Sequence, residues 1–479
     1  MESLITQGSG RRTKIVATIG PACDPPGVLE SMIQAGLDVA RINFSHGEPQ
    51  EHLERIARVR EAAKTVGRVV AIIADLPGPK LRCTIEEPRD LKEGEEISLA
   101  ISPDVECDLP STMPHALGDV HPGEPILLDD GRIKLIAGKQ RNRCLYAKVE
   151  VGGRLLPHKG INLPDTKLSI PPLTPRDLAA LDVAAEAKVE WVALSFVRDA
   201  DAADVLRWEI KVRDHDAAII AKIERPEAVR NIKQIAEAFD GIMVARGDMG
   251  VELPLAEVPR FQKEIIAASV LMGKPVITAT EMLESMRDAP RPTRAEAADV
   301  ANAIWDGTDA VMLSAETAVG KYPVETVRTM ATIAEVTDGH FRERRAHKIE
   351  VTQGMVIESI CHSATMLAED IEAKAILAPT SEGHTPRLIA RYRPPQWIIA
   401  TSSNPATVHR MALYWGVVPF LTKPSVEGED RLKAAEAEIY EAALLNKEDR
   451  LVMVTEHPIL GWEAAPTIRV TGLDPDEVT

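Results

Sequence analysis

The side chains of this sequence that are best suited to chemistry stand at or just beyond the ends of apolar, strand-like runs. They are Arg41, Asn43, Ser45, Asp75, Lys222, Glu224, Arg246, Asp248, Thr280, Glu281, Ser314 and Glu316. Side chains two positions apart on a strand share a face, so the spacing of Lys222 and Glu224 directs both to the same side. Acids and bases gathered in this way could hold a metal ion and an anionic substrate.

The acids and bases of this set define the expected chemistry. Glu224 and Asp248 offer the hard oxygen ligands that suit Mg²⁺, which keeps waters or substrate oxygens in its other positions. Arg41, Lys222 and Arg246 would clamp and neutralise phosphoryl oxygens. The sequence has neither an HExxH motif nor a GxxxxGK[ST] loop, which excludes a zinc site of that type and a P-loop nucleotide site. We therefore expect a Mg²⁺-dependent enzyme acting on a small phosphorylated or carboxylated substrate.

Each of these residues, taken alone, also has an ordinary structural interpretation. An aspartate after a strand commonly caps a helix or forms a turn, and a Lys-x-Glu pair is commonly a surface ion pair. The chemical interpretation depends on their occurrence together, at the same end of at least six strands. The carboxyl ends of the strands of a parallel barrel meet at one rim, which is where the active sites of such barrels lie.

Eight strand-like runs predict the barrel that would bring these side chains together. They span residues 14–20, 39–45, 68–75, 191–197, 218–224, 241–247, 275–280 and 310–316. Helical patterns such as 293–305 lie between most of them, and runs that are apolar on both faces are typical of a buried parallel sheet. The expected fold class is α/β: a (β/α)₈ TIM barrel with an inserted small β-barrel domain and a C-terminal α/β domain.

Changes in this rhythm set the expected domain boundaries. Residues 83–163 are rich in strand patterns, with the hairpin signal Asp130-Gly131, and are expected to form the inserted domain, which would act as a lid. The catalytic barrel would then comprise residues 12–82 and 164–338, and the C-terminal regulatory domain residues 339–479. Residues 1–11 are expected to be a flexible N-terminus.

The composition excludes several classes of partner. The net charge is −17, and aromatic residues make up only 4% of the chain of 479 residues. Neither nucleic acid nor an anionic membrane is therefore an expected partner, and no apolar stretch is long enough to span a membrane. An odd number of scattered cysteines predicts free thiols and a cytoplasmic location; these are Cys23, Cys83, Cys107, Cys144 and Cys361.

Long segments around these residues resemble pyruvate kinase. In order along the chain they are TKIVATIGPA (13–22), VARINFSHG (39–47), KGINLP (159–164), AKIERPEAV (221–229), IMVARGDMGVELP (242–254), TATEMLESM (278–286), the block 292–323 and IARYRP (389–394). The resemblance covers nearly the whole chain from residue 12. It implies transfer of the phosphoryl group of phosphoenolpyruvate to ADP, giving pyruvate and ATP in the last step of glycolysis, with Mg²⁺ or, in its place, Mn²⁺.

The resemblance assigns roles in phosphoryl transfer to the matching residues. Arg41 would hold the transferred phosphoryl group, and Lys222 would stabilise its charge during the transfer. Glu224 and Asp248 would ligate the Mg²⁺. The backbone amides of Gly247 and Asp248 would meet the substrate carboxylate.

The resemblance also assigns the proton step and the nucleotide side. Thr280 would lie beside the enolate face that takes the proton, and Ser314 and Glu316 would support a water-linked route to it. Ser195 matches a further substrate-binding position. The positions near the nucleotide and its second metal are Pro21, His46, Arg82 and Lys159.

Lys80 departs from a common pattern of the family. Many pyruvate kinases need K⁺, held by residues matching Asn43, Ser45 and Asp75 and by the backbone carbonyl at Leu76; they carry glutamate at the place of Lys80. Relatives with lysine there work without K⁺. A tethered ammonium about 4 Å from an anionic site is worth up to ~4 kcal/mol at an effective dielectric constant of ~20. We therefore expect that K⁺ is not required and that Asp75 is the partner of Lys80.

The segment 379–394 resembles the loop that holds an effector phosphate in the family. It offers Thr380, Ser381, Gly383, His384 and Thr385. Glu382 stands where relatives activated by fructose bisphosphate have a small hydroxyl residue, and it would place a like charge near the phosphate. A sugar monophosphate, AMP, no activator and an ordinary helix-capping loop all remain open. Family membership also implies a homotetramer.

Two other functions are compatible with the residues at the rim. A Mg²⁺-dependent oxo-acid aldolase or lyase on a TIM barrel shares the Glu/Asp metal pair, but it would not need the inserted domain or the third domain. A non-catalytic binding protein on the same scaffold would be expected to have lost Lys222 or a metal ligand, and both are present. Formation of pyruvate from phosphoenolpyruvate and ADP would discriminate among the three functions.

Overall fold

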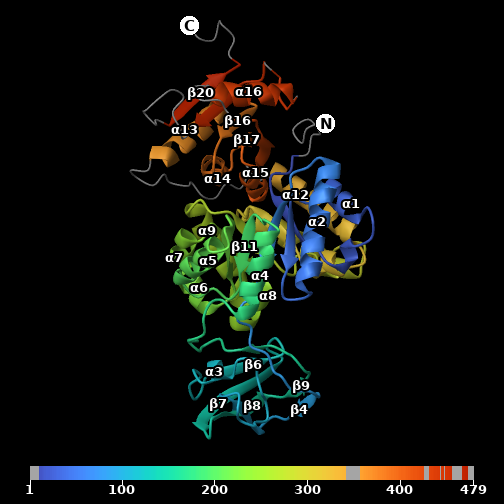
Figure 1. Ribbon diagram of the computed structural model, residues 1–479, viewed down its shortest axis with the longest axis vertical. Helices are drawn as coiled ribbons and strands as arrows, with labels where there is room; N and C mark the ends of the chain where they lie inside the picture. The colour runs from blue at the N-terminus through green and yellow to red at the C-terminus, as the bar shows by residue number, and fades with distance from the viewer. Residues whose placement is uncertain are drawn as a thin grey trace.

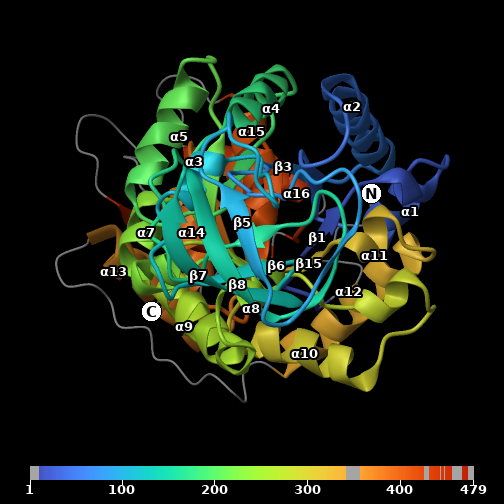
Figure 2. The same ribbon diagram turned by 90° about the horizontal axis from the view of Figure 1, so that it is seen from below.

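The chain folds into three parts stacked along one long axis (Figure 1). The computed structural model describes residues 10–340, 356–424, 431–442, 444–446, 448–455 and 466–472, and only the backbone of residues 431 and 432. A barrel lies in the middle, with the C-terminal strands above it; Figure 2 shows the inserted strands in front of the barrel. Of the expected flexible N-terminus, residues 1–9 lie outside the described residues, whereas Arg11 is held by Asp38 at 2.7 Å.

Eight parallel strands close into the barrel predicted from the sequence. The order around it is β1-β15-β14-β13-β12-β11-β3-β2. The bounds are β1 (Lys14–Thr18), β2 (Val39–Asn43), β3 (Ala71–Asp75), β11 (Trp191–Leu194), β12 (Ala218–Ile223), β13 (Gly241–Ala245), β14 (Val276–Ala279) and β15 (Ala310–Leu313). Nearly all of their residues are buried, because helices cover the outer face and side chains fill the interior. The predicted fold class is confirmed.

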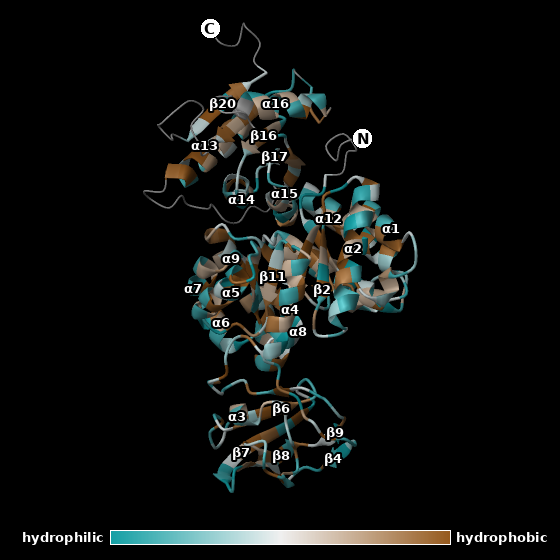
Figure 3. Cartoon of the chain, in the orientation of Figure 1, coloured by the Kyte–Doolittle hydropathy of each residue, from teal (hydrophilic) through white to brown (hydrophobic). Residues whose placement is uncertain are grey.

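Helices surround the barrel and turn polar residues outward (Figure 3). They are α1 (Val28–Ala35), α2 (Pro49–Val66), α4 (Pro175–Glu186), α5 (Asp201–Lys211), α6 (Pro226–Arg230), α7 (Ile232–Ala238), α8 (Arg246–Glu252), α9 (Val258–Leu271), α10 (Arg294–Trp305), α11 (Ala315–Ala318) and α12 (Pro323–Gly339). The start of α10 is fixed by reciprocal capping. The Thr293 hydroxyl accepts from the Glu296 N–H, and the Glu296 carboxylate accepts from the Thr293 N–H.

The interior of the barrel is continuous with the core of the C-terminal part. Val16 and Ile73 of the barrel belong to the same buried apolar cluster as Tyr414. Trp191, at the amino end of β11, is fully buried; its ring meets that of Tyr414 edge-on at 6.3 Å, and its N–H donates to the carbonyl of Arg410. The amino end of the barrel is thus closed by the C-terminal part of the chain.

The residues that the structure describes between 356 and 472 form a five-stranded α/β unit. Its strand order is β18-β17-β16-β19-β20, and only β20 is antiparallel. The elements are α13 (Val356–Asp370), β16 (Ala375–Pro379), α14 (His384–Arg391), β17 (Trp397–Ser402), α15 (Pro405–Arg410), β18 (Val417–Leu421), α16 (Arg431–Glu441), β19 (Leu451–Thr455) and β20 (Thr467–Thr471). The C-terminal α/β domain of the predicted fold class is confirmed.

The inserted region, between β3 and β11, is antiparallel and has its own apolar cluster. It comprises β4 (Arg89–Leu91), β5 (Glu96–Ala100), α3 (Pro114–Leu117), β6 (Pro125–Leu128), β7 (Ile133–Arg141), β8 (Cys144–Val151), β9 (Gly153–Leu155) and β10 (Ile161–Asn162). Where a small β-barrel was expected, the strands form one sheet of order β10-β6-β7-β8-β5 and a pair β4-β9. Asp130 and Gly131 join β6 to β7 with positive φ angles, as the hairpin signal predicted.

The prediction of free thiols is wrong for two of the five cysteines. Cys107 and Cys144 form a disulfide. Cys144 pairs with Ala100 across the β5–β8 ladder, so the loop that follows β5 returns close to it. Cys23, Cys83 and Cys361 are buried and take no part in this disulfide. Burial raises the pKa of Cys23 to about 11 and that of Cys83 to about 12.

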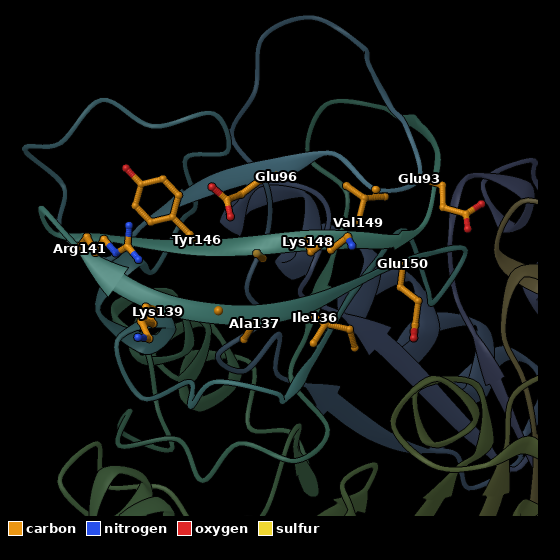
Figure 4. A pocket seen from close by; sticks show the side chains of 13 residues that line it. Glu93, Glu96, Ile136, Ala137, Lys139, Arg141, Tyr146, Lys148, Val149 and Glu150 are labelled. Carbon is orange, nitrogen blue, oxygen red and sulfur yellow. The ribbon is translucent and has the colours of Figure 1, made fainter.

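A cavity of about 670 Å³ lies on the inserted region (Figure 4). Lys139, Arg141 and Lys148 line it together with Glu93 and Glu150. Because side chains of both charge signs line it, it favours no single class of ligand, and none of the side chains at the barrel rim lines it. Within the residues that the structure describes, no helix is both long and apolar enough to cross a membrane.

Candidate active site

Arg41, Asp75 and Lys222 meet at the carboxyl end of the barrel. Arg41 Nε donates to Asp75 Oδ2 over 2.6 Å, and Lys222 Nζ lies 3.2 Å from Asp75 Oδ1. Arg41 Nη1 also donates to the hydroxyl of Thr18 over 2.8 Å. Asp75 is only 2% exposed, so one buried carboxylate orients two cations that come from other strands.

The charges of these groups shift each other's pKa. Burial would raise the pKa of Asp75, but Arg41 and Lys222 outweigh it and hold that pKa below its ordinary value. Burial likewise disfavours the charged form of Lys222, but Asp75 and Glu224 outweigh it and raise the pKa of Lys222. At neutral pH, Asp75 is therefore a carboxylate and Lys222 an ammonium.

Lys222 has two further partners, Glu224 and Ser195. Its Nζ lies 3.0 Å from Glu224 Oε1 and donates to Ser195 Oγ over 2.6 Å. Ser195 Oγ donates in turn to the carbonyl of Leu76 over 2.8 Å. An ammonium has three N–H groups, so contacts with Asp75, Glu224 and Ser195 fix the position of this one.

Glu224 has unused capacity for a cation. Its Oε2 accepts from the N–H of Phe196 over 2.8 Å. Its Oε1 is buried and, apart from the ion-pair contact with Lys222, makes no hydrogen bond in the described part of the chain. Burial raises the pKa of Glu224 to about 7. The charge of Asp248 also raises this pKa, whereas the charge of Lys222 lowers it. A divalent cation at Oε1 would favour the ionised form.

Lys80 pairs with Asp248, so the expectation that Asp75 is its partner is wrong. Lys80 Nζ lies 2.9 Å from Asp248 Oδ1. Both oxygens of Asp75 are already shared between Arg41 and Lys222. The side chains of Lys80 and Asp248 are 27% and 31% exposed, so their ion pair is partly solvated. The ammonium of Lys80 is thus ion-paired with Asp248, one of the two carboxylates expected to ligate the metal.

Arg246 was expected to clamp a phosphoryl group, but its guanidinium is already engaged by other residues of the protein. Its Nη1 donates to Asp299 over 2.7 Å, and its Nη2 donates to the carbonyl of Thr280 over 2.5 Å. The reason is local: β13 ends at Ala245, and Arg246 and Asp248 both belong to α8. Residues two apart on a helix do not face the same side, whereas on a strand they do.

The turn after β14 holds Thr280 in an unusual backbone conformation. Its φ is +70° and that of Glu281 is +53°, in the left-handed region that a β-branched residue seldom adopts. The Thr280 hydroxyl accepts from the N–H of Gly247 over 2.7 Å and donates to the carbonyl of Ala279 over 2.6 Å. The Gly247 amide, expected to meet the substrate carboxylate, is therefore engaged by Thr280 in this structure.

Ser314 and Glu316 follow β15 and brace the same rim. Glu316 is buried; its Oε2 accepts from the N–H of Ser314 over 2.6 Å and its Oε1 from the N–H of Leu283 over 3.3 Å. Leu283 lies three residues after Thr280. Glu316 therefore supports the turn that positions Thr280, and within the described residues it makes no hydrogen bond with Thr280 itself.

The residues that match a monovalent-cation site lie side by side at the ends of β2 and β3. Asn43 is the ladder partner of Asp75, and its Oδ1 accepts from the N–H of Ser45 over 3.0 Å. Leu76 follows Asp75 directly and presents its carbonyl to Ser195. Asn43, Ser45, Asp75 and Leu76 therefore lie close together at the rim.

The residues expected on the nucleotide side do not join this cluster. Arg82 and Lys159 lie where the chain enters and leaves the inserted region, and Lys159 Nζ pairs with Asp129 at 2.7 Å. Pro21 follows β1, His46 follows β2, and both are exposed. Among the described residues, no hydrogen bond or ion pair connects these four positions with Lys222, Glu224 or Asp248.

Thr18 and Phe196 are site residues that the sequence reasoning missed. Thr18 is the polar last residue of β1, so the rule that found the other strand-end residues could have found it. Phe196 acts through its backbone N–H, at a φ of +57°. The type of its side chain gives no sign of that role.

Glu224 and Asp248 fit a divalent ion that takes its other ligands from water and substrate. Within the described residues, no group of three or more His, Cys, Asp and Glu side chains could hold a metal. Mg²⁺ is usually bound through one or two carboxylates together with waters and substrate phosphate oxygens. Glu224 Oε1, which makes no hydrogen bond in the part of the chain described beyond its ion pair with Lys222, and the Asp248 carboxylate, which already attracts a cation, supply that donor set.

The loop before α14 has the form of a helix-capping loop. Gly383 caps α14 with a φ of +88°, and its N–H donates to the Thr380 hydroxyl over 2.9 Å. Glu382 and His384 are exposed and lie 3.8 Å apart. The other residues expected to bind an effector are Ser381 and Thr385, of which Thr385 is buried.

Comparison with known proteins points to one family. Residues 10–327 match the family model "Pyruvate kinase, barrel domain", and residues 358–471 match "Pyruvate kinase, alpha/beta domain". The pyruvate kinase of Geobacillus stearothermophilus is 44% identical over 459 residues, which cover 93% of this chain and 77% of that protein. The pyruvate kinase of Thermococcus litoralis is 42% identical over 474 residues, 96% of this chain and 98% of that protein.

Proposed function

The chain belongs to the pyruvate kinase family, and from that premise we propose that the cluster around Lys222 carries its reaction. The reaction transfers the phosphoryl group of phosphoenolpyruvate to ADP, giving pyruvate and ATP, and the family requires a divalent metal. The supporting observation is a chain of ion pairs at the carboxyl end of the barrel, which runs from Arg41 through Asp75 and Lys222 to Glu224. Phosphoryl transfer depends mainly on positioning and electrostatic stabilisation, which such a cluster can supply.

The balance of charge at the rim explains the need for a metal. The Lys222 cluster and the Lys80–Asp248 pair together hold three cations and three carboxylates: Arg41, Lys80 and Lys222 with Asp75, Glu224 and Asp248. With every group ionised their formal charges cancel, so the side chains alone offer little net attraction for an anionic substrate. We propose that Glu224 and Asp248 hold Mg²⁺, for which Mn²⁺ can substitute; the ion would neutralise charge that develops on the phosphoryl and enolate oxygens.

The two fixed cations have separate tasks in this proposal. Arg41 is held through Nε and Nη1, and its Nη2 makes no hydrogen bond within the described residues, so it can bind a phosphoryl oxygen. Lys222 keeps its charge at neutral pH and stabilises the charge of the migrating group. Thr280, braced by Ser314 and Glu316, would lie beside the enolate face that takes the proton.

Replacement of Lys222 tests the proposal. Lys222→Met should lower phosphoryl transfer by about 100-fold or more, because an electrostatic contact to the transition state is lost. Binding of phosphoenolpyruvate in the presence of Mn²⁺ should remain measurable. Pyruvate formation and Mn²⁺-dependent substrate binding are measured side by side, with the exposed Lys233→Met as the charge-matched control. Turnover near that of the unmodified protein would contradict the role of Lys222.

We also propose that the enzyme works without K⁺. The ammonium of Lys80 lies 2.9 Å from Asp248 and so brings a permanent positive charge into the site. Pyruvate formation in buffers free of K⁺ should be close to that with K⁺ added, whereas Lys80→Glu should create a requirement for K⁺. Strong activation of the unmodified protein by K⁺ would reject the proposal.

Several further assignments rest on the resemblance to the family. We propose that Pro21, His46, Arg82 and Lys159 serve the nucleotide and its second metal, that the loop 380–385 receives a phosphate of an effector, and that the chain forms a cytoplasmic homotetramer. Titration of AMP and sugar monophosphates against the substrate saturation curve tests the effector. Sedimentation analysis tests the oligomeric state.

A further inference from the structure

The return segment, residues 161–170, leads from the inserted region back to the barrel and is tied down by a buried arginine. Arg225 Nη2 donates to the carbonyls of Leu163 and Thr166 over 3.1 and 3.3 Å. Arg225 is 4% exposed. The position of the return segment is therefore set from the barrel, next to Glu224.

Glu252 joins the same arginine to the inserted region. Its Oε1 accepts from Asn162 Nδ2 over 2.7 Å, and its Oε2 lies 3.5 Å from Arg225 Nη1. Asn162 belongs to β10, the last strand of the inserted region. Asn162 and Glu252 are each 5% exposed, so water does not screen these contacts as it would at the surface.

The arginine and the glutamate each belong to an element that carries a candidate metal ligand. Arg225 follows Glu224 in the chain, and Glu252 lies one helical turn after Asp248 on α8. A cavity of about 20 Å³, room for a single water, is lined by Asn162, Arg225 and Glu252. Hydrogen bonds and an ion pair, rather than close apolar contact alone, therefore connect these elements.

We propose that Glu252 is a positioning residue that couples the placement of the inserted region to the spacing of the Glu224 and Asp248 carboxylates. Through Asn162 it holds the inserted region, through Arg225 it holds the residue after Glu224, and through α8 it holds Asp248. The inference rests on the proposed function in one respect, namely that Glu224 and Asp248 bind the divalent ion.

The first test measures the inserted region without any metal. Spin labels are placed at the exposed positions Lys139, on β7, and Lys233, on α7, of the full-length protein with its disulfide intact. Loss of the Glu252 contacts should broaden the distribution of distances between the labels. We expect this for Glu252→Ala and for Asn162→Ala, and the two changes together should have little more effect than either alone, because they remove one contact.

The second test measures binding of Mn²⁺ in the absence of substrate. Residues that orient metal ligands without touching the metal typically change affinity by 10- to 100-fold, so Glu252→Ala should weaken Mn²⁺ binding by about 10-fold. Glu252→Gln keeps an acceptor for Asn162 but loses the ion pair with Arg225. Its affinity for Mn²⁺ should therefore lie between that of the unmodified protein and that of Glu252→Ala. If the alanine variant does not fold, the glutamine variant supplies both measurements.

A matched control separates positioning from general stability. Glu190 is another buried carboxylate paired with an arginine, at 2.6 Å from Arg60, but it precedes β11 at the amino end of the barrel. Glu190→Gln should lower thermal stability while leaving the label distances and the Mn²⁺ affinity unchanged. If the Glu252 variants behave in the same way, Glu252 is only a structural residue and the inference is wrong.

Failure of the proposed function would look different. Glu224→Gln and Asp248→Asn should each weaken Mn²⁺ binding severely. If they do not, the proposed metal site is wrong, whatever the Glu252 variants show. If they do, while Glu252→Ala retains both the label distances and the Mn²⁺ affinity of the unmodified protein, the metal site stands and the coupling through Glu252 is overturned.

Discussion

Removal of the Lys80 ammonium should strengthen the binding of a divalent ion to the protein without substrate. Lys80 Nζ lies 2.9 Å from Asp248 Oδ1, so an ion that approaches Asp248 must compete with a cation that is already there. In Lys80→Met the competitor is lost, and so is its repulsion of the incoming ion. Both effects act in the same direction.

The magnitude follows from the exposure of the Lys80–Asp248 pair. Its side chains are 27% and 31% exposed, so solvent screens the attraction, and pairs of this kind are worth about 0.2–1 kcal/mol. Converted with RT, that energy corresponds to a dissociation constant for Mn²⁺ that falls by a factor between about 1.4 and about 5.

Titration calorimetry or electron paramagnetic resonance with Mn²⁺ measures this constant directly. Lys80→Arg keeps the charge and should bind Mn²⁺ like the unmodified protein, and Lys233→Met controls for a change of net charge on the surface. High salt should reduce the difference between Lys80→Met and the unmodified protein, since screening already weakens the pair. Weaker binding in Lys80→Met would refute the competition between Lys80 and the metal.

Three further predictions concern stability. Glu224 in the folded protein has a pKa of about 7 against an ordinary value of 4.5, so between those values the folded state binds more protons than the unfolded state. The contribution of Glu224 to the free energy of unfolding is therefore lost as pH rises from about 4.5 to about 7, by a few kcal/mol at most. Urea unfolding of the metal-free protein should show this fall in the free energy of unfolding, and Glu224→Gln should lack it. The same dependence on pH in both proteins would contradict the prediction. Asp75→Asn leaves two buried cations without their shared carboxylate and should lower the free energy of unfolding by about 3–5 kcal/mol; a loss below about 1 kcal/mol in urea titrations would rule this out. Replacing Cys107 and Cys144 by serine should destabilise the inserted region by about 2–4 kcal/mol, measured by hydrogen exchange with and without a reducing agent, and identical exchange would count against it.

The barrel could be predicted from the sequence because its signals are local. Each strand is a short apolar run, and the runs are separated by helical patterns, so all eight strands were found. Their ends were less accurate. The run 241–247 was taken as a strand to its end, but β13 stops at Ala245, and this changed the direction in which Arg246 points.

The partners of the site residues could be predicted only in part. The position of Arg41, Asp75, Lys222 and Glu224 at strand ends was enough to predict that they lie together. A parallel barrel brings the carboxyl ends of its strands to one rim. The partner of Lys80 depends instead on how the segment between β3 and the inserted region lies against α8. No local pattern encodes the contact of Lys80 with Asp248, which are 168 residues apart.

The disulfide and the contacts of Glu252 could not be predicted from the sequence, for the same reason. Cys107 and Cys144 are 37 residues apart and follow no recognisable spacing. Asn162 and Glu252 are 90 residues apart, and each alone is an ordinary polar residue. Only the packing of the inserted region against the barrel brings such residues together.

The two regions attached to the barrel differ in how easily each could be exchanged by recombination. Because apolar side chains run without a break from the barrel interior to Tyr414, a chain ending after α12 would expose large groups such as Trp191, each worth about 1.5–3 kcal/mol of burial. Such a fragment would aggregate. The inserted region, which buries its own apolar residues, could be grafted between relatives without uncovering the barrel, provided that the Asn162–Glu252 contact is transplanted with it.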